Sequence, residues 1–113
     1  MFVTTAIDGD TAVISPRGEI DFDALPDLLA APTHLPRTVT RVVWDLHQAT
    51  FMDIAGLHLL AGQRDACRRS HRELTVTGLG RQAEHLLLLA RSVFPAYDFD
   101  EFLPSDASPA QVA

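Results

Sequence analysis

The sequence contains no lysine and only one cysteine, Cys67, among its 113 residues. A single cysteine cannot form a disulfide within the chain, which agrees with a reducing compartment, so we expect a cytoplasmic protein. All nine basic residues are arginines, fifteen residues are acidic, and the formal net charge is −6. This balance argues against direct binding of nucleic acid, which favours a net basic surface.

Long apolar runs are also missing. No stretch approaches the 18 or more apolar residues of a membrane helix, so we expect no membrane insertion. The N-terminus has no basic region followed by an apolar one, so no signal peptide is expected. The chain is long enough to bury the core of one globular domain. Its composition, 47% hydrophobic and 21% charged residues, also fits a globular protein.

The usual patterns of metal and catalytic sites are absent. No two of the five histidines have the i, i+4 spacing of a metal-binding helix, and no cysteine pair completes a zinc site. The chain has no Gly-x-Ser-x-Gly segment to present a nucleophilic serine. We therefore expect no metal, no cofactor and no enzymatic activity.

The first half of the chain alternates strand and turn signals. Residues 2–7 and 11–17 predict two strands joined by an Asp-Gly turn. Residues 18–21 are then expected to leave the sheet, and Asp23 is predicted to cap a helix over 24–31. The nearly continuous apolar run at 40–46 is typical of a strand covered on both faces.

Helices alternate with a short strand in the second half. The pattern predicts helices over 55–70 and 81–93 with a strand at 74–77 between them. Residues 96–103 are predicted to form an edge strand that turns into a short helix, and residues 104–113 a flexible tail. The alternation predicts one α/β domain, residues 1–103, in which helices pack on a mixed, mostly parallel sheet.

Two side-chain groups on these helices have alternative interpretations. Arg64, Arg68, Arg69 and Arg72 gather near the end of the first long helix, where a solvated face is favoured over a binding patch. Residues 86–89 are four consecutive leucines, which extend more than halfway round a helix. Leu88 or Leu89 should therefore lie outside the core, and this pair is the candidate contact for a homodimer.

The most informative stretch is residues 42–57, VVWDLHQATFMDIAGL. It predicts a buried strand, a short loop and an Asp-x-x-Gly corner that opens a helix. The Asp53 carboxylate can accept the backbone N–H of Ala55 or Gly56, and Gly56 permits a close approach to the first turn. A helix N-terminus at the edge of a sheet is suited to handling negative charge.

This combination resembles the STAS family, the domain shared by sulfate transporters and anti-sigma factor antagonists. Residues 17–21, RGEID, are similar to the family's Gly-Glu-Leu-Asp turn. Residues 42–57 resemble its central motif, which usually ends in Asp-Ser-Ser-Gly-Leu. Residues 93–98, VFPAYD, resemble its Phe-Pro-x-Tyr segment. The three segments follow in the family's order along nearly the whole chain.

The resemblance to the antagonist branch implies a switchable protein–protein contact. In that branch the domain binds a kinase-type anti-sigma factor, and the kinase then phosphorylates a serine at the start of the central helix. The added charge breaks the complex. Here the two serine positions fall on Ile54 and Ala55, with Ala55 at the phosphoacceptor position. The resemblance therefore implies an antagonist-like protein that phosphorylation at this site cannot switch.

The predicted contacts with the anti-sigma factor surround the start of this helix. They are Asp21, His47, Thr50, Asp53, Ile54, Ala55, Gly56, Leu57 and His58. Asp53 can serve as cap, contact or both, whereas Asp45 is expected only to orient the loop. Two alternatives remain open. One is an accessory STAS subunit of a lipid-transport or sensory, stressosome-type assembly, and the other is a small-ligand sensor.

Overall fold

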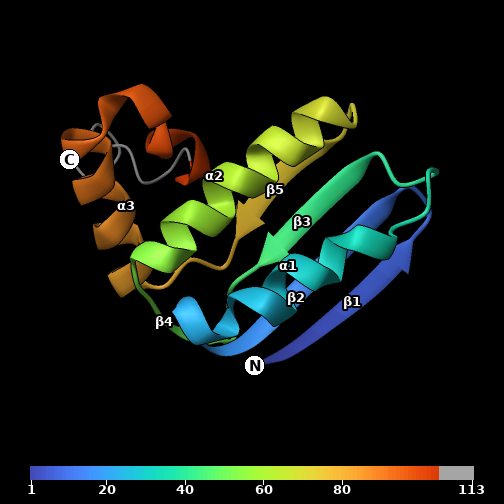
Figure 1. Ribbon diagram of the computed structural model, residues 1–113, viewed down its shortest axis with the longest axis horizontal. Helices are drawn as coiled ribbons and strands as arrows, with labels where there is room; N and C mark the ends of the chain where they lie inside the picture. Colours follow the sequence, from blue (N-terminus) through green and yellow to red (C-terminus); the bar gives the residue numbers. More distant parts are fainter. Residues whose placement is uncertain (105–113) are drawn as a thin grey trace.

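A five-stranded mixed sheet organises the computed structural model, which describes residues 1–104 (Figure 1). Four strands follow the spatial order β1-β2-β3-β5, and the fifth strand, β4, pairs with the end of β2. The strands are β1 (Phe2–Asp8), β2 (Thr11–Ile20), β3 (Arg41–Asp45), β4 (Ala49–Met52) and β5 (Glu73–Thr77). Among the strand pairs of residues 1–104, only β1–β2 is antiparallel, so the predicted mixed, mostly parallel α/β sheet is confirmed.

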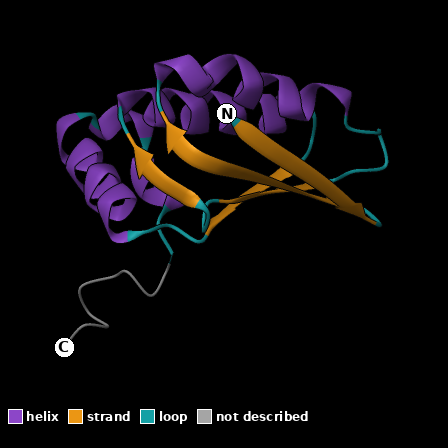
Figure 2. Ribbon diagram, turned by 90° about the horizontal axis from the view of Figure 1, so that it is seen from below, coloured by secondary structure: helices purple, strands orange, loops and turns teal. Residues whose placement is uncertain are grey.

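Residues 1–104 form three α-helices, and helices cover one face of this sheet (Figure 2). They are α1 (Leu25–Ala30), α2 (Ile54–Arg69) and α3 (Arg81–Val93). The predicted range of α3 is confirmed, and α2 begins and ends one residue before its predicted limits. Beneath α1 and α2 the inward side chains of β2 and β3, among them Ile14 and Trp44, are fully buried. The chain thus has the two-layer core that an amphipathic helix and a one-sided sheet require.

The end of β2 differs from the expectation that residues 18–21 leave the sheet. The strand continues to Ile20, with a register shift between Gly18 and Glu19. Gly18 has a φ of 105°, a conformation that glycine adopts readily, so the strand bends there and changes partner from β3 to β4. β4 was predicted as part of a loop, because four residues give too little periodicity to distinguish a strand.

The predicted cap at Asp23 is also wrong. The carboxylate of Asp21 accepts the backbone N–H of Ala24 at 3.0 Å and caps a 3-10 turn, Phe22–Ala24, that precedes α1. The turn follows directly on β2, so the first aspartate after the strand is the one with extended backbone geometry, as an N-cap requires.

One face of α2 is buried in the core. Leu59, Leu60, Gln63 and Cys67 are buried, as is Gly56. Burial raises the pKa of the Cys67 thiol, although the charge of Arg72 acts in the opposite direction. Cys67 is therefore a small core residue with little thiolate character.

The segment after α3 is not the predicted edge strand. Residues 94–103, which we call the C-terminal strap, form two 3-10 turns, Pro95–Tyr97 and Phe99–Phe102. Side chains three residues apart in a 3-10 turn point the same way, and Phe99 and Phe102 are both buried against the body of the domain. Burial of two aromatic rings outweighs the modest strand propensity of this acidic segment.

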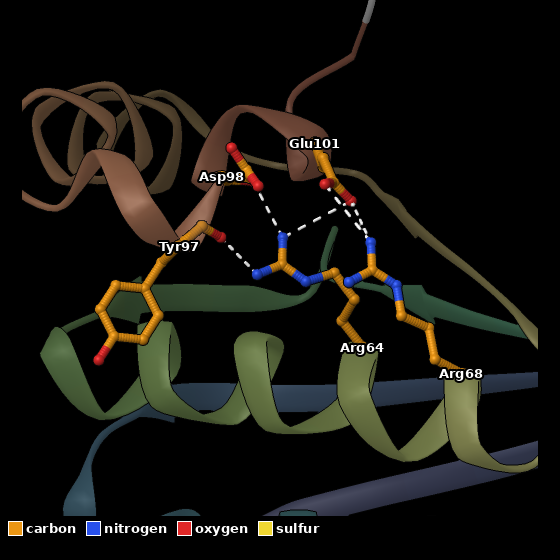
Figure 3. Close-up of polar contacts among 5 residues, drawn as sticks. All are labelled: Arg64, Arg68, Tyr97, Asp98 and Glu101. Atoms are coloured by element: carbon orange, nitrogen blue, oxygen red, sulfur yellow. Dashed lines mark hydrogen bonds and ion pairs between the residues drawn. The ribbon is translucent and has the colours of Figure 1, made fainter.

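Arg64 fastens this strap to α2, contrary to the solvated arginine face predicted there (Figure 3). Its guanidinium is nearly buried and donates to the carbonyl oxygens of Tyr97 and Asp98, the latter at 2.9 Å. It also lies over the ring of Phe102, 4.9 Å from the ring centroid. Arg68, which is exposed, adds an ion pair of 3.1 Å with Glu101. A buried, multiply bonded guanidinium holds the strap in one position.

Other terminal expectations have mixed outcomes. Leu89 is 62% exposed, as predicted for a leucine outside the core, while Leu88 is half-buried. A homodimer contact at this pair stays a prediction.

The predicted tail lies outside the described residues except for Pro104, which is exposed. Among residues 1–104, no helix combines the length and apolar character needed to cross a membrane.

We expect Arg64→Met to lower the free energy of unfolding by about 2–4 kcal/mol, because it leaves two strap carbonyls without their donor. The matched control is Arg68→Gln, whose exposed ion pair should contribute at most about 1 kcal/mol. Urea unfolding followed by circular dichroism measures both values. Equal stability of the two variants would show that the strap does not depend on Arg64.

Candidate functional site

The candidate site is the corner where β4 ends and α2 begins. The Asp53 carboxylate accepts the backbone N–H of Ala55 at 2.8 Å, which confirms the predicted helix cap. The backbone N–H of Asp53 donates to the carbonyl of Ile20 at 3.1 Å. These two bonds fix the first turn of α2 to the end of β2, so the corner is part of the rigid scaffold.

The first turn presents one apolar side chain and buries the next three residues. Ile54 is 57% exposed, whereas Ala55 is 5% exposed and Gly56 and Leu57 are buried. His58, one turn on from Ile54, is exposed again. Direct contacts at Ala55, Gly56 and Leu57 were expected, but these residues lie beneath the surface because their side of the helix faces the sheet.

Gly56 explains how the helix can start so close to the sheet. A Cβ atom at this position would lie 2.1 Å from Cγ of Met52 and 3.3 Å from Cγ2 of Ile20. The predicted close approach is therefore confirmed, and the approaching element is the preceding strand. Met52 is itself held from the other side, because the Gln82 amide accepts from its N–H at 2.9 Å and donates to its carbonyl at 2.7 Å.

The loop residues of the predicted site have distinct local roles. The carboxylate of Asp45 lies 2.8 Å from Nδ1 of His47 and accepts the His47 backbone N–H at 3.1 Å. This arrangement agrees with the orienting role predicted for Asp45. Thr50 is exposed on β4. Asp21 is half-buried and caps the turn before α1, so its carboxylate is already engaged on one side.

Two exposed aromatic residues near the corner were missed. Phe22 is 76% exposed, and Phe51 on β4 is also exposed. Phe22 lies two residues beyond Ile20, whose carbonyl is bonded to Asp53, so it belongs to the same end of the sheet as Ile54. The signal in the sequence was an aromatic residue between two aspartates, a place where core residues are rare. Phe22 and Phe51 are thus two further exposed apolar side chains near the corner.

A cleft lies immediately beside Ile54. It has a volume of about 130 Å³ and runs between the first turns of α2 and the C-terminal strap. Its lining residues are Ile54, Leu57, His58, Ala61, Phe94, Tyr97 and Phe99. The cleft is therefore mainly apolar, with His58 and Tyr97 as the side chains that carry polar groups. Within residues 1–104, no group of three or more His, Cys, Asp or Glu side chains is placed to hold a metal ion.

The mixed sheet, the capped corner and the helices on one side define a domain of the STAS type. The chain belongs to the family described as "Mlab, STAS domain", whose model matches residues 3–92. No curated protein matches the sequence. The family assignment confirms the resemblance drawn from the three sequence segments.

Solved structures of the same fold include anti-sigma factor antagonists and a sulfate transporter family protein. The unphosphorylated anti-sigma factor antagonist SpoIIAA, from Bacillus, has a TM-score of 0.66 at 18% identity, over 79% of this chain and 80% of that chain. An antisigma-factor antagonist STAS domain from Rhodobacter sphaeroides has a TM-score of 0.61 at 22% identity, over 75% and 94%. A sulfate transporter family protein from Wolinella succinogenes has a TM-score of 0.65 at 14% identity, over 89% and 77%. At these identities the likeness concerns the fold.

The two glycines of α2 provide a matched test of the corner. A Cβ atom added at Gly62 would have no atom within 4 Å. Gly62→Ala should therefore stabilise the protein by about 0.5–1 kcal/mol, the usual gain from alanine within a helix. Gly56→Ala should instead destabilise it by about 1–3 kcal/mol, because Met52 must move within a packed core. Urea unfolding measures both changes. A stabilising Gly56→Ala would contradict the close contact between α2 and β4.

Proposed function

We propose that the chain is a non-enzymatic, cytoplasmic binding protein that docks onto a kinase-type anti-sigma factor through the start of α2. The observation that supports this most is the exposure of Ile54 at a corner fixed by hydrogen bonds on both sides. An apolar side chain held rigidly in solvent is a typical anchor for a protein partner. The similarity in fold to anti-sigma factor antagonists favours that class of partner.

The contact surface in this proposal consists of the exposed residues around the corner. Ile54 lies at its centre, with Asp21, His47, Thr50, Asp53 and His58 around it, and Phe22 and Phe51 extend it. Ala55, Gly56 and Leu57 support it from below by setting the position of the first turn. The apolar centre supplies the affinity and the polar rim sets the orientation, as in other protein interfaces.

The same proposal includes the loss of a switch. Ala55 stands at the position of the family's phosphoacceptor serine and has no hydroxyl group, and neither has Ile54. Alanine matches the unmodified serine in charge and nearly in size. The contact would therefore remain in the state that relatives have before phosphorylation, without the repulsion that a phosphate adds.

We expect Ile54→Asp to weaken binding of the anti-sigma factor at least tenfold, because it places a charge where the apolar anchor docks. The fold should tolerate the change, since an acidic residue suits the first turn of a helix. The matched control is Leu89→Asp, which introduces the same charge at an equally exposed apolar position of α3 and should bind normally. Calorimetric titration against candidate kinases measures this. Equal affinities for both variants would exclude the corner as the interface.

We expect the wild-type complex to be insensitive to ATP, because neither Ile54 nor Ala55 carries a hydroxyl group that a kinase could phosphorylate. Ala55→Asp should bind more weakly than wild type without ATP. Mass spectrometry and pull-down with and without ATP measure these outcomes, and thermal unfolding verifies that each variant folds. Phosphate on the wild-type protein near residue 55 would contradict the proposed loss of the switch.

A second candidate is an accessory subunit of a lipid-transport or sensory assembly. Such a subunit needs no phosphoacceptor, so the missing hydroxyl groups favour it equally. The description of the matching family model names Mlab and no anti-sigma factor antagonist, which also favours the accessory subunit. Co-purification from the native cell separates the two candidates, because the first predicts a histidine-kinase-like ATPase and the second a membrane ATPase or a large sensory complex.

A further inference from the structure

The cleft beside Ile54 has two walls from distant parts of the chain. Ile54 and His58 form one wall, on the first two turns of α2, and Phe94, Tyr97 and Phe99 form the other. The family model ends at residue 92, so the aromatic wall lies outside the matched region. Tyr97 is 56% exposed and Phe94 is also exposed, so the mouth of the cleft is apolar on both sides.

The aromatic wall is held in place before any partner arrives. The Tyr97 ring stacks on Phe99 with 5.8 Å between centroids, and Phe94 meets the edge of Tyr97 at 6.3 Å. The backbone beneath Tyr97 is fastened to α2 by Arg64, as Figure 3 shows. A cleft with fixed walls loses little conformational entropy when it is filled, which favours binding.

The charges along both walls have one sign. Among residues 53–61, Asp53 is the only aspartate, glutamate, arginine or lysine. Residues 94–103 contain Asp98, Asp100 and Glu101 and no basic residue. Glu101 is paired with Arg64 and Arg68. The nearest arginines along the chain are Arg64, which the strap engages, and Arg91 in the last turn of α3. The cleft is thus an apolar slot between acidic segments.

We propose that this cleft receives one apolar side chain from a basic segment of the partner protein, with a flanking arginine or lysine facing Asp53 and Asp98. The inference rests on the proposed function, which makes the start of α2 a docking site, and it adds the chemistry of the partner. The apolar lining accounts for the anchor and the acidic flanks account for the charge beside it. The cleft is large enough for one leucine-sized side chain.

Amide chemical shifts of the full-length chain test this with three capped peptides. The probe is acetyl-Gly-Arg-Leu-Arg-Gly-amide, and the controls replace either both arginines by glutamate or the leucine by serine. We expect only the probe to shift the amide signals of Ile54, His58 and Phe99 in a saturable way. Shifts spread over the whole acidic surface, or equal shifts with either control peptide, would overturn the proposal.

Variants that preserve the fold then distinguish the contribution of the acidic flanks to peptide binding from that of the cleft itself. Asp53→Asn keeps a good helix cap, and Asp98→Asn suits the left-handed backbone at that position, where φ is 51°. We expect this double variant to bind the probe at least threefold more weakly and with less dependence on salt. Ala61→Leu should block the cleft and abolish the shifts. Asp65→Asn, at an exposed position of α2, is the control and should leave them unchanged.

The outcomes distinguish this inference from the proposed function. If a kinase-type anti-sigma factor binds wild type and Ala61→Leu equally, the cleft is not used and the inference fails, while docking at Ile54 stands. If the peptide binds in the cleft and no such kinase binds the protein, the inference stands and the identity of the partner must be revised. Unchanged peptide binding by the Asp53→Asn/Asp98→Asn variant would refute the proposed charge pairing.

Discussion

The close contact between Gly56 and Met52 is the constraint on which the site depends. It allows α2 to begin directly at the end of β4, where a side chain on the helix would otherwise collide with the strand. The cap by Asp53 and the bond from its N–H to Ile20 then determine the direction of the first turn. The same arrangement that buries Ala55 and Leu57 forces Ile54 outward, so the exposed anchor is a consequence of how the helix packs.

A second constraint lies at the other end of the chain. Arg64 is buried in the middle of α2 and replaces water around the carbonyl groups of the strap. Such a guanidinium is costly to bury, and the cost is offset because several acceptors and an aromatic ring surround it. The strap in turn provides the aromatic wall beside the corner. One core contact and one buried cation thereby define a single surface, with an apolar anchor and an adjoining slot.

Parts of this structure with strong local signals were predictable. The Asp-Gly hairpin, the apolar run of β3 and the periodic helices α2 and α3 each carry a pattern within one element, and the cap at Asp53 follows from residue type. β4 was missed because it has four residues and one pairing partner. The cap at Asp21 was assigned to Asp23 because both aspartates precede the helix, and only the strand's true end distinguishes them.

The amino-acid sequence by itself determined the fold family, the position of the corner and the lack of a hydroxyl group at Ile54 and Ala55, since these depend on residue identity and short spacings. The tertiary structure decided which corner residues face solvent, that Phe22 is exposed as well, and that Arg64 is buried beneath the strap. The reason is that exposure depends on which distant segment covers a side chain. Residues 54–57 are all apolar and form one helix turn, yet Ile54 can contact a partner and the other three are buried.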